Sequence, residues 1–98
     1  MGFKLDILLS AKIDIWESMD WYNEKQPGLG NRFYEDFAAT VKYIITNPYL
    51  FPVKRRPLRE CVLKKFPFII IYDIHEENVI IHAVFNTSKN PGQKPKKY

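Results

Sequence analysis

The chain has 98 residues and a formal net charge of +4, and 46% of its residues are hydrophobic. This length is typical of one domain, and this apolar content excludes an intrinsically disordered chain. No apolar run approaches the roughly 20 residues of a membrane-spanning helix, so we expect no membrane association. The single cysteine, Cys61, cannot form a disulfide within the chain, and the start carries no recognisable secretory signal, which together indicate a cytoplasmic protein.

Positive charge is concentrated in the second half of the sequence. Residues 1–50 carry five Lys or Arg against seven Asp or Glu, whereas residues 54–65 carry six basic residues and one acid. Residues 86–98 add four lysines and no acid. A basic half joined to a neutral or acidic half indicates a surface that binds a polyanion, either a nucleic acid or an acidic protein.

The first predicted elements are a strand and an amphipathic helix. Apolar and polar residues alternate from residue 3 to residue 7, as in a half-buried strand. Ser10 is a natural N-cap, and Asp14 favours the positive end of the helix that follows, which Pro27-Gly28 ends. The predicted core face of this helix consists of Ile15, Trp16, Met19 and Tyr22. Trp21 points away from that face and is a candidate for a partner surface.

A second predicted helix begins near Leu29 or Gly30 and ends at Asn47-Pro48. Its core face consists of Phe33, Phe37, Thr40, Val41 and Ile44, while Glu35, Asp36 and Lys42 lie elsewhere on the helix. Because the connection between the two helices is short, we expect them to form an antiparallel hairpin.

Beyond residue 49 the pattern is that of β-strands. A short edge strand is expected at residues 53–56, followed by strands at 59–65, 68–74 and 79–85, and the last two flank the turn Glu76-Glu77-Asn78. The predicted fold class is α+β, with a two-layer β-α-α-β-β-β order in which a helical hairpin packs on a curved, mainly antiparallel sheet. We expect residues 1–91 to form this single domain and residues 92–98 to form a basic tail.

One face of the sheet meets the helices, and the open face is where we expect the functional residues and a positive charge. In the strand at 79–85, the apolar set Val79, Ile81, Ala83 and Phe85 is assigned to the helices, so that His82 and Asn86 point outward. In the strand at 68–74, Phe68, Ile70, Tyr72 and Ile74 are assigned to the helices, and Ile69, Ile71, Asp73 and His75 to the open face. The strand at 59–65 fits either orientation.

His82 is the candidate for acid–base chemistry, because an imidazole titrates near neutral pH. A histidine that only hydrogen-bonds to a neighbouring side chain is the alternative interpretation. Cys61 lies in a basic stretch that favours a thiolate, but a buried structural thiol is the interpretation we prefer. The two histidines lack the spacing of metal ligands and no phosphate-binding loop occurs, so we predict no metal and no cofactor.

Four segments carry a family resemblance: Phe66–Tyr72 and Val79–Pro91, with Trp21-Tyr22 and Gly28–Phe33 upstream. Together they resemble the RelE/ParE superfamily of toxins from bacterial type II toxin–antitoxin modules, which includes plasmid stabilisation proteins. The RelE-like branch cleaves mRNA on the ribosome without a metal, whereas the ParE-like branch inhibits DNA gyrase by binding. In both branches the resemblance implies a small antitoxin protein as partner, whose tail wraps the toxin.

Carried over residue by residue, the resemblance implies an incomplete nuclease site. Arg59 matches a basic residue that would contact phosphate. Ile69 and Asn86, however, stand where RelE-like enzymes tend to have arginine and histidine, and Lys89 stands where arginine is usual. These departures favour a ParE-like inhibitor of DNA gyrase.

Two alternatives stay open: a RelE-like ribosome-dependent mRNA endonuclease, and an inert module that retains the fold. Whether the chain is an enzyme is therefore left open. In a nuclease, Arg59 and Lys89 would hold phosphate and His82 would transfer the proton. The residues predicted to bind nucleic acid or a protein partner are Arg55, Arg56, Lys64, Lys65, Asn86 and Trp21.

Overall fold

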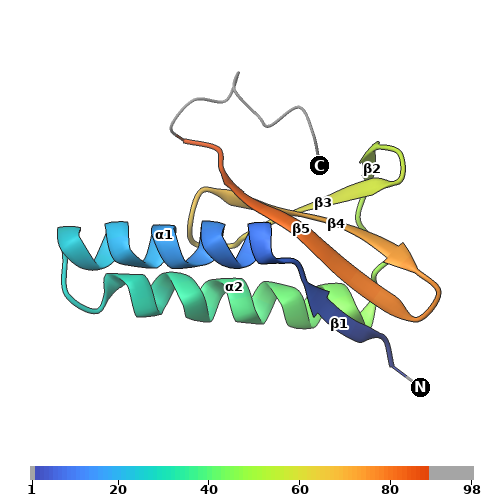
Figure 1. Ribbon diagram of the computed structural model, residues 1–98, viewed down its shortest axis with the longest axis horizontal. Helices are drawn as coiled ribbons and strands as arrows, with labels where there is room; N and C mark the ends of the chain where they lie inside the picture. Colours follow the sequence, from blue (N-terminus) through green and yellow to red (C-terminus); the bar gives the residue numbers. More distant parts are fainter. Residues whose placement is uncertain (1, 89–98) are drawn as a thin grey trace.

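The structure is a computed structural model that describes residues 2–88 (Figure 1). Its elements, in chain order, are β1 (Lys4–Ile7), α1 (Leu9–Lys25), α2 (Leu29–Thr46), β2 (Val53–Arg55), β3 (Leu58–Val62), β4 (Phe68–His75) and β5 (Asn78–Asn86). The two helices form a hairpin that lies on one face of the sheet, so the predicted two-layer α+β fold is confirmed. Lys89 and the proposed tail at 92–98 lie outside the described residues.

The five strands form one sheet with the order β1-β5-β4-β3-β2. β1 pairs with β5 in parallel, and all other neighbouring strands pair antiparallel, so the sheet is mainly antiparallel, as predicted. The short β2 is an edge strand, which also matches the expectation for residues 53–56. β5 and β4 therefore lie inside the sheet, and the two helices cover one of its faces (Figure 1).

Two glycines shape the turn between the helices. Gly28 has a φ of 90°, a left-handed conformation that glycine adopts without strain. Gly30 lies where α2 passes close to α1, because its backbone N–H donates to Oδ1 of Asn23 at 2.8 Å. A Cβ atom at Gly30 would collide with the carbonyl oxygen of Met19 and the side chain of Asn23. The hairpin thus requires a glycine at this crossing.

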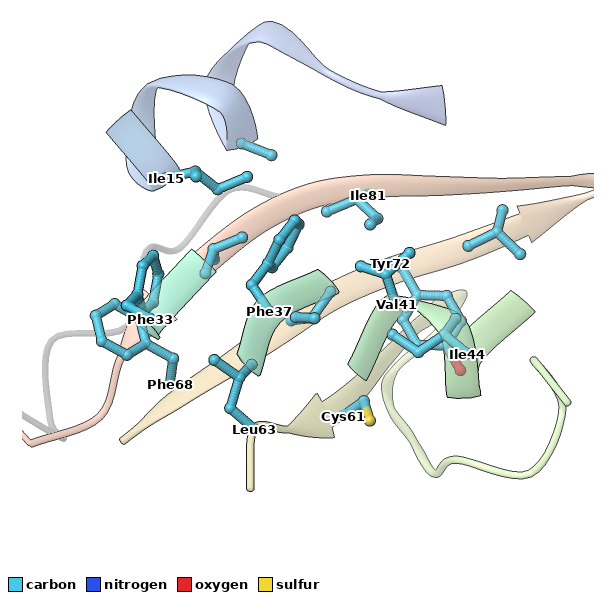
Figure 2. Close-up of a cluster of buried hydrophobic side chains, with 14 residues drawn as sticks. Ile15, Phe33, Phe37, Val41, Ile44, Cys61, Leu63, Phe68, Tyr72 and Ile81 are labelled. Carbon is cyan, nitrogen blue, oxygen red and sulfur yellow. The ribbon is translucent and has the colours of Figure 1, made fainter. Parts of the chain in front are cut away.

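The main core lies between the helices and the sheet, as Figure 2 shows. The predicted face of α2 is confirmed, since all of its members are buried: Phe33, Phe37, Thr40, Val41 and Ile44. Phe68, Ile70 and Tyr72 from β4 meet them from the sheet, also as predicted. In β3 the orientation left open by the sequence is resolved, because Cys61 belongs to this core. Leu63, just beyond the strand, belongs to it as well.

The core face of α1 was predicted wrongly at one position. Ile15 is buried and Met19 packs against the core, but Trp16 is exposed. The fully buried residue at the start of the helix is Ala11. Because α1 packs against α2 and β5 at the same time, the small Ala11 side chain fits the close approach and the large indole of Trp16 points to the solvent side.

α1 is attached to the edge of β5 through hydrogen bonds beyond the end of β1. The N–H of Leu8 donates to the carbonyl oxygen of Ile81 at 3.0 Å. The hydroxyl of Ser10 donates to the carbonyl oxygen of His82 at 2.8 Å. One turn later, Oδ2 of Asp14 accepts from the N–H of Val84 at 3.0 Å. Ser10 and Asp14 are spaced i, i+4, so one helix face provides both partners.

The predicted N-cap role of Ser10 is therefore wrong. α1 already begins at Leu9, and its N-cap residue, Leu8, makes no side-chain cap hydrogen bond. The Ser10 hydroxyl instead donates to β5, because a strand edge without a strand neighbour needs other partners for its backbone groups.

A β-bulge at His82 changes which side chains of β5 face the helices. Ile71 pairs with Ala83 and Tyr72 with Ile81, which leaves His82 as the extra residue. The carbonyls of two successive residues, Ile81 and His82, consequently point to the same edge of the strand. Beyond the bulge, Val84 joins the main core.

The assignment of Ala83 and Phe85 to the helices was therefore wrong. Both belong to a separate cluster on the outer face of the sheet, together with Ile69 and Ile71. The sequence alternation of β5 was correct as far as His82, because the extra residue reverses the faces after that point. The outward assignment of Asn86 was therefore wrong as well, since Asn86 pairs with Phe68 on the side of the helices.

Asp36 was expected away from the core, but the structure buries its side chain. Its Oδ2 accepts hydrogen bonds from the backbone N–H groups of Lys65 at 2.8 Å and Phe66 at 3.0 Å. The carboxylate thus holds the connection between β3 and β4 against α2, and these bonds account for the burial of its charge.

We predict that Asp14→Ala lowers the free energy of unfolding by about 1–2 kcal/mol, because the N–H of Val84 loses its acceptor. Asp14→Asn keeps an acceptor oxygen and should retain most of the stability. Urea denaturation of the three proteins at neutral pH measures the difference. Equal stability of the alanine and wild-type proteins would show that the contact contributes nothing.

The same carboxylate gives a pH dependence of known sign. Burial raises the pKa of Asp14 above its ordinary value of 3.8, the Val84 N–H lowers it, and Glu17 raises it. A raised folded-state pKa means that the folded chain binds the proton more tightly, so stability falls as pH rises from 3.8 through the folded pKa. Wild type should therefore lose stability relative to Asp14→Asn over that range, in paired urea titrations. A difference that is constant with pH would contradict this.

Candidate functional site

The outer face of the sheet has an apolar centre. Leu58, Ile69, Ile71 and Ala83 form a buried cluster there, with Phe85 packed against it, and we call these five residues the outer-face cluster. None of them carries a charge. The expectation of a positively charged open face is therefore wrong for the centre of that face, and the basic side chains lie elsewhere.

His82 and Asp73 form a pair beside the outer-face cluster. Nε2 of His82 lies 3.2 Å from Oδ1 of Asp73, and the two side chains are 26% and 21% exposed. Both residues were predicted on this face, and the structure confirms it. With Nε2 donating to the carboxylate, Nδ1 is the acceptor nitrogen of the ring, as a general base requires. The pairing itself was not foreseen, although both residues were assigned outward on neighbouring strands.

Arg59 lies on the opposite side of the sheet from His82. It alternates along β3 with Leu58 of the outer-face cluster, and its Nη1 donates to the carbonyl oxygens of Phe51 at 2.6 Å and Tyr49 at 3.3 Å. Its guanidinium also lies 5.3 Å from the centre of the Tyr49 ring. The structure therefore does not bring Arg59 and His82 together.

Arg59 thus bonds to the connection between α2 and β2, and Tyr72 anchors this connection as well. Its hydroxyl donates to the carbonyl oxygen of Pro48 at 2.7 Å. Burial raises the pKa of Tyr72 to about 12, with Cys61 raising and Arg59 lowering it to a smaller extent. Tyr72 therefore keeps its proton and donates at neutral pH. Arg59 and Tyr72 together fix the path of residues 48–51.

The other predicted basic residues lie around the margin of the sheet. Arg55 and Arg56 are exposed at the β2–β3 turn, and Lys64 and Lys65 are exposed in the β3–β4 connection. Nζ of Lys64 lies 5.4 Å from the centre of the Tyr43 ring on α2. A pocket of about 180 Å³ opens near the first pair and is lined by Tyr49, Val53, Arg56, Pro57, Arg59 and Ile74.

The two remaining predicted binding residues are Trp21 on α1 and Asn86 on β5. Trp21 is exposed on α1, as predicted, and Nζ of Lys25 lies 4.9 Å from the centre of its ring. Asn86 ends β5, where its Oδ1 accepts from the N–H and hydroxyl of Ser88 at 2.8 and 2.9 Å. Asn86 thus orders the start of the segment that follows the sheet.

Cys61 is a buried structural residue, as the sequence analysis preferred. Burial raises the pKa of its thiol to about 11, so the basic neighbours in sequence do not produce a thiolate. Within residues 2–88, no group of His, Cys, Asp or Glu side chains is arranged to hold a metal ion. Neither α1 nor α2 is long and apolar enough to span a membrane.

The comparisons with known proteins support the fold. No protein-family model matches the sequence, and no curated protein matches it either. Among solved structures, the chain is similar to a chain of the "Chromosomal ParDE TA system from P. aeruginosa", with a TM-score of 0.77 and 17% sequence identity. The match covers 86% of this chain and 95% of that chain. The chain therefore has a ParE-like fold, and the resemblance noted from the sequence is confirmed at the level of the fold.

We predict that Arg59→Gln lowers the free energy of unfolding by about 1–2 kcal/mol, because two carbonyl oxygens lose a charged donor. Arg56→Gln is the matched control: this arginine is exposed on the same pocket, and its loss should change stability by less than about 0.5 kcal/mol. Chemical denaturation measures both. If the two variants are equally stable, Arg59 does not anchor the connection.

Proposed function

We propose that the chain is the toxin of a type II toxin–antitoxin module, acts in the cytoplasm by binding DNA gyrase, and is neutralised by a cognate antitoxin. The observation that carries this proposal is the structural likeness to a chain of a ParDE toxin–antitoxin system over almost the whole of both chains. The likeness supports the toxin fold, and the choice of gyrase rests on the residues of the outer face.

Three features support binding rather than RNA cleavage. Arg59 donates to backbone carbonyls on the helix side, away from His82. Ile69, at a position where the resemblance implies an arginine in nucleases, is buried in the outer-face cluster and cannot stabilise charge on a phosphate. The exposed basic residues Arg56 and Lys65 lie at the margin, where they suit contact with an acidic protein surface.

A RelE-like mRNA endonuclease is the second candidate, and the His82–Asp73 pair favours it. A carboxylate that orients an imidazole is the arrangement expected of a proton-transfer group acting on a ribose hydroxyl. In this candidate, Arg59 would not hold the phosphate beside His82, because it donates to backbone carbonyl oxygens on the other side of the sheet, and Lys89 would be the phosphate-binding residue.

The first test is expression with and without the product of a neighbouring antitoxin-like reading frame. We expect growth arrest that the neighbour relieves, DNA-damage signalling in the arrested cells, and inhibition of gyrase supercoiling by the purified chain. Replacing Arg56 and Lys65 by Glu should weaken this inhibition roughly tenfold, since both changes reverse charge at the proposed contact. Lys42→Glu, on the exposed face of α2, is the control and should inhibit as wild type does. Intact supercoiling would contradict the gyrase proposal, and the absence of growth arrest would indicate an inert module.

The second test distinguishes the nuclease. In a translating extract, the wild-type chain should leave mRNA intact if gyrase is the target. If mRNA is cut, His82→Gln should abolish the cutting and Asp73→Asn should reduce it, whereas neither change should affect supercoiling. Cutting that survives His82→Gln would exclude His82 as the proton-transfer group.

A further inference from the structure

An apolar stripe on α1 faces away from the core. Leu9, Ile13 and Trp16 are 66%, 41% and 56% exposed, and their spacing of four and three residues places them on one face of the helix. Ala11 and Ile15, which enter the core, lie on the other side. α1 packs against α2 and against β5 (Figure 1). The exposure of the three stripe residues shows that neither contact covers them.

The stripe follows the pattern of a short parallel coiled coil. If Ile13 is an a position, Leu9 and Trp16 are d positions, so the exposed residues match the seam of a heptad. Lys12 then takes a g position and Glu17 an e position, which are the positions that form ion pairs between helices. Within residues 2–88, neither Lys12 nor Glu17 makes a salt bridge.

We propose that this stripe binds a second copy of the chain, with the two α1 helices packed parallel about a two-fold axis. In this arrangement Lys12 of each copy pairs with the partner's Glu17, so the surface is complementary to itself, as a two-fold interface requires. Ile13 and Trp16 pack across the seam. The charges select the orientation, because an antiparallel pair would place Lys12 on the side of the partner's Lys12 and Glu17 on the side of the partner's Glu17.

The length of the stripe limits the strength of the dimer. The next a position is Asp20, an exposed acid, so the apolar seam ends after Trp16 and spans two helical turns. Association through so short a seam is weak and depends on concentration. This proposal is independent of the target of the chain, because α1 carries neither the outer-face cluster nor the exposed basic residues at the margin of the sheet, which are Arg55, Arg56, Lys64 and Lys65.

Sedimentation velocity of the full chain over a wide concentration range tests the proposal. We expect a monomer–dimer equilibrium, which Trp16→Gln shifts to monomer. Lys12→Glu alone and Glu17→Lys alone should each weaken the dimer roughly tenfold, because each change makes both interhelical pairs repulsive. An equimolar mixture of these two variants should dimerise more strongly than either alone, since both pairs in the mixed dimer are again attractive.

Each outcome is decisive. Wild type that stays monomeric at all concentrations overturns the proposal, as does a dimer that persists in Trp16→Gln. A mixture that dimerises no better than the separate variants excludes the parallel arrangement. Lys42→Glu on α2 is the matched control and should leave the dimer unchanged. Circular dichroism of each variant checks the fold, and Ile13→Gln provides a second seam variant where Trp16→Gln fails to fold.

Discussion

The attachment of α1 to the bulged edge of β5 is the contact on which the rest of the structure depends. β1 ends at Ile7, so the second half of β5 has a strand, β4, on one edge only, and Ser10 and Asp14 satisfy backbone groups on the other edge. The same bulge brings Ala83 onto the outer face and turns Val84 toward the helices, while His82 keeps its outward position next to Asp73. The packing of the two layers and the make-up of the outer-face cluster therefore have one structural cause.

Several polar side chains that suggest chemistry in the sequence serve the architecture. Arg59 and Tyr72 hold the connection after α2 through its carbonyl oxygens, and Asp36 holds the β3–β4 connection through its N–H groups. Buried polar groups need partners, and long connections on a small sheet provide them. Among the polar residues discussed for chemistry, those left for contact with other molecules are the His82–Asp73 pair and the exposed basic residues Arg56 and Lys65.

Much of the fold was predictable because hydrophobic periodicity is a local signal. α2 was predicted correctly, since its apolar residues follow a helical repeat against one continuous sheet. α1 was harder: its contact with two neighbours makes Ala11 more buried than Trp16, and the size of a side chain does not reveal this. The bulge in β5 was not predictable either, because the residues around His82 are apolar on both faces and alternation gives no register. The role of Asp36 depends on partners about 30 residues away in sequence, which no local pattern indicates.

The burial of Cys61 has a practical consequence. It is the one cysteine in the sequence, and its thiol has a pKa of about 11, so it is almost fully protonated and shielded at neutral pH. Maleimide dyes and nitroxide spin labels react with accessible thiolates. A cysteine introduced at an exposed position such as Glu24 should therefore be labelled selectively, with the native residue left in place to fill the core.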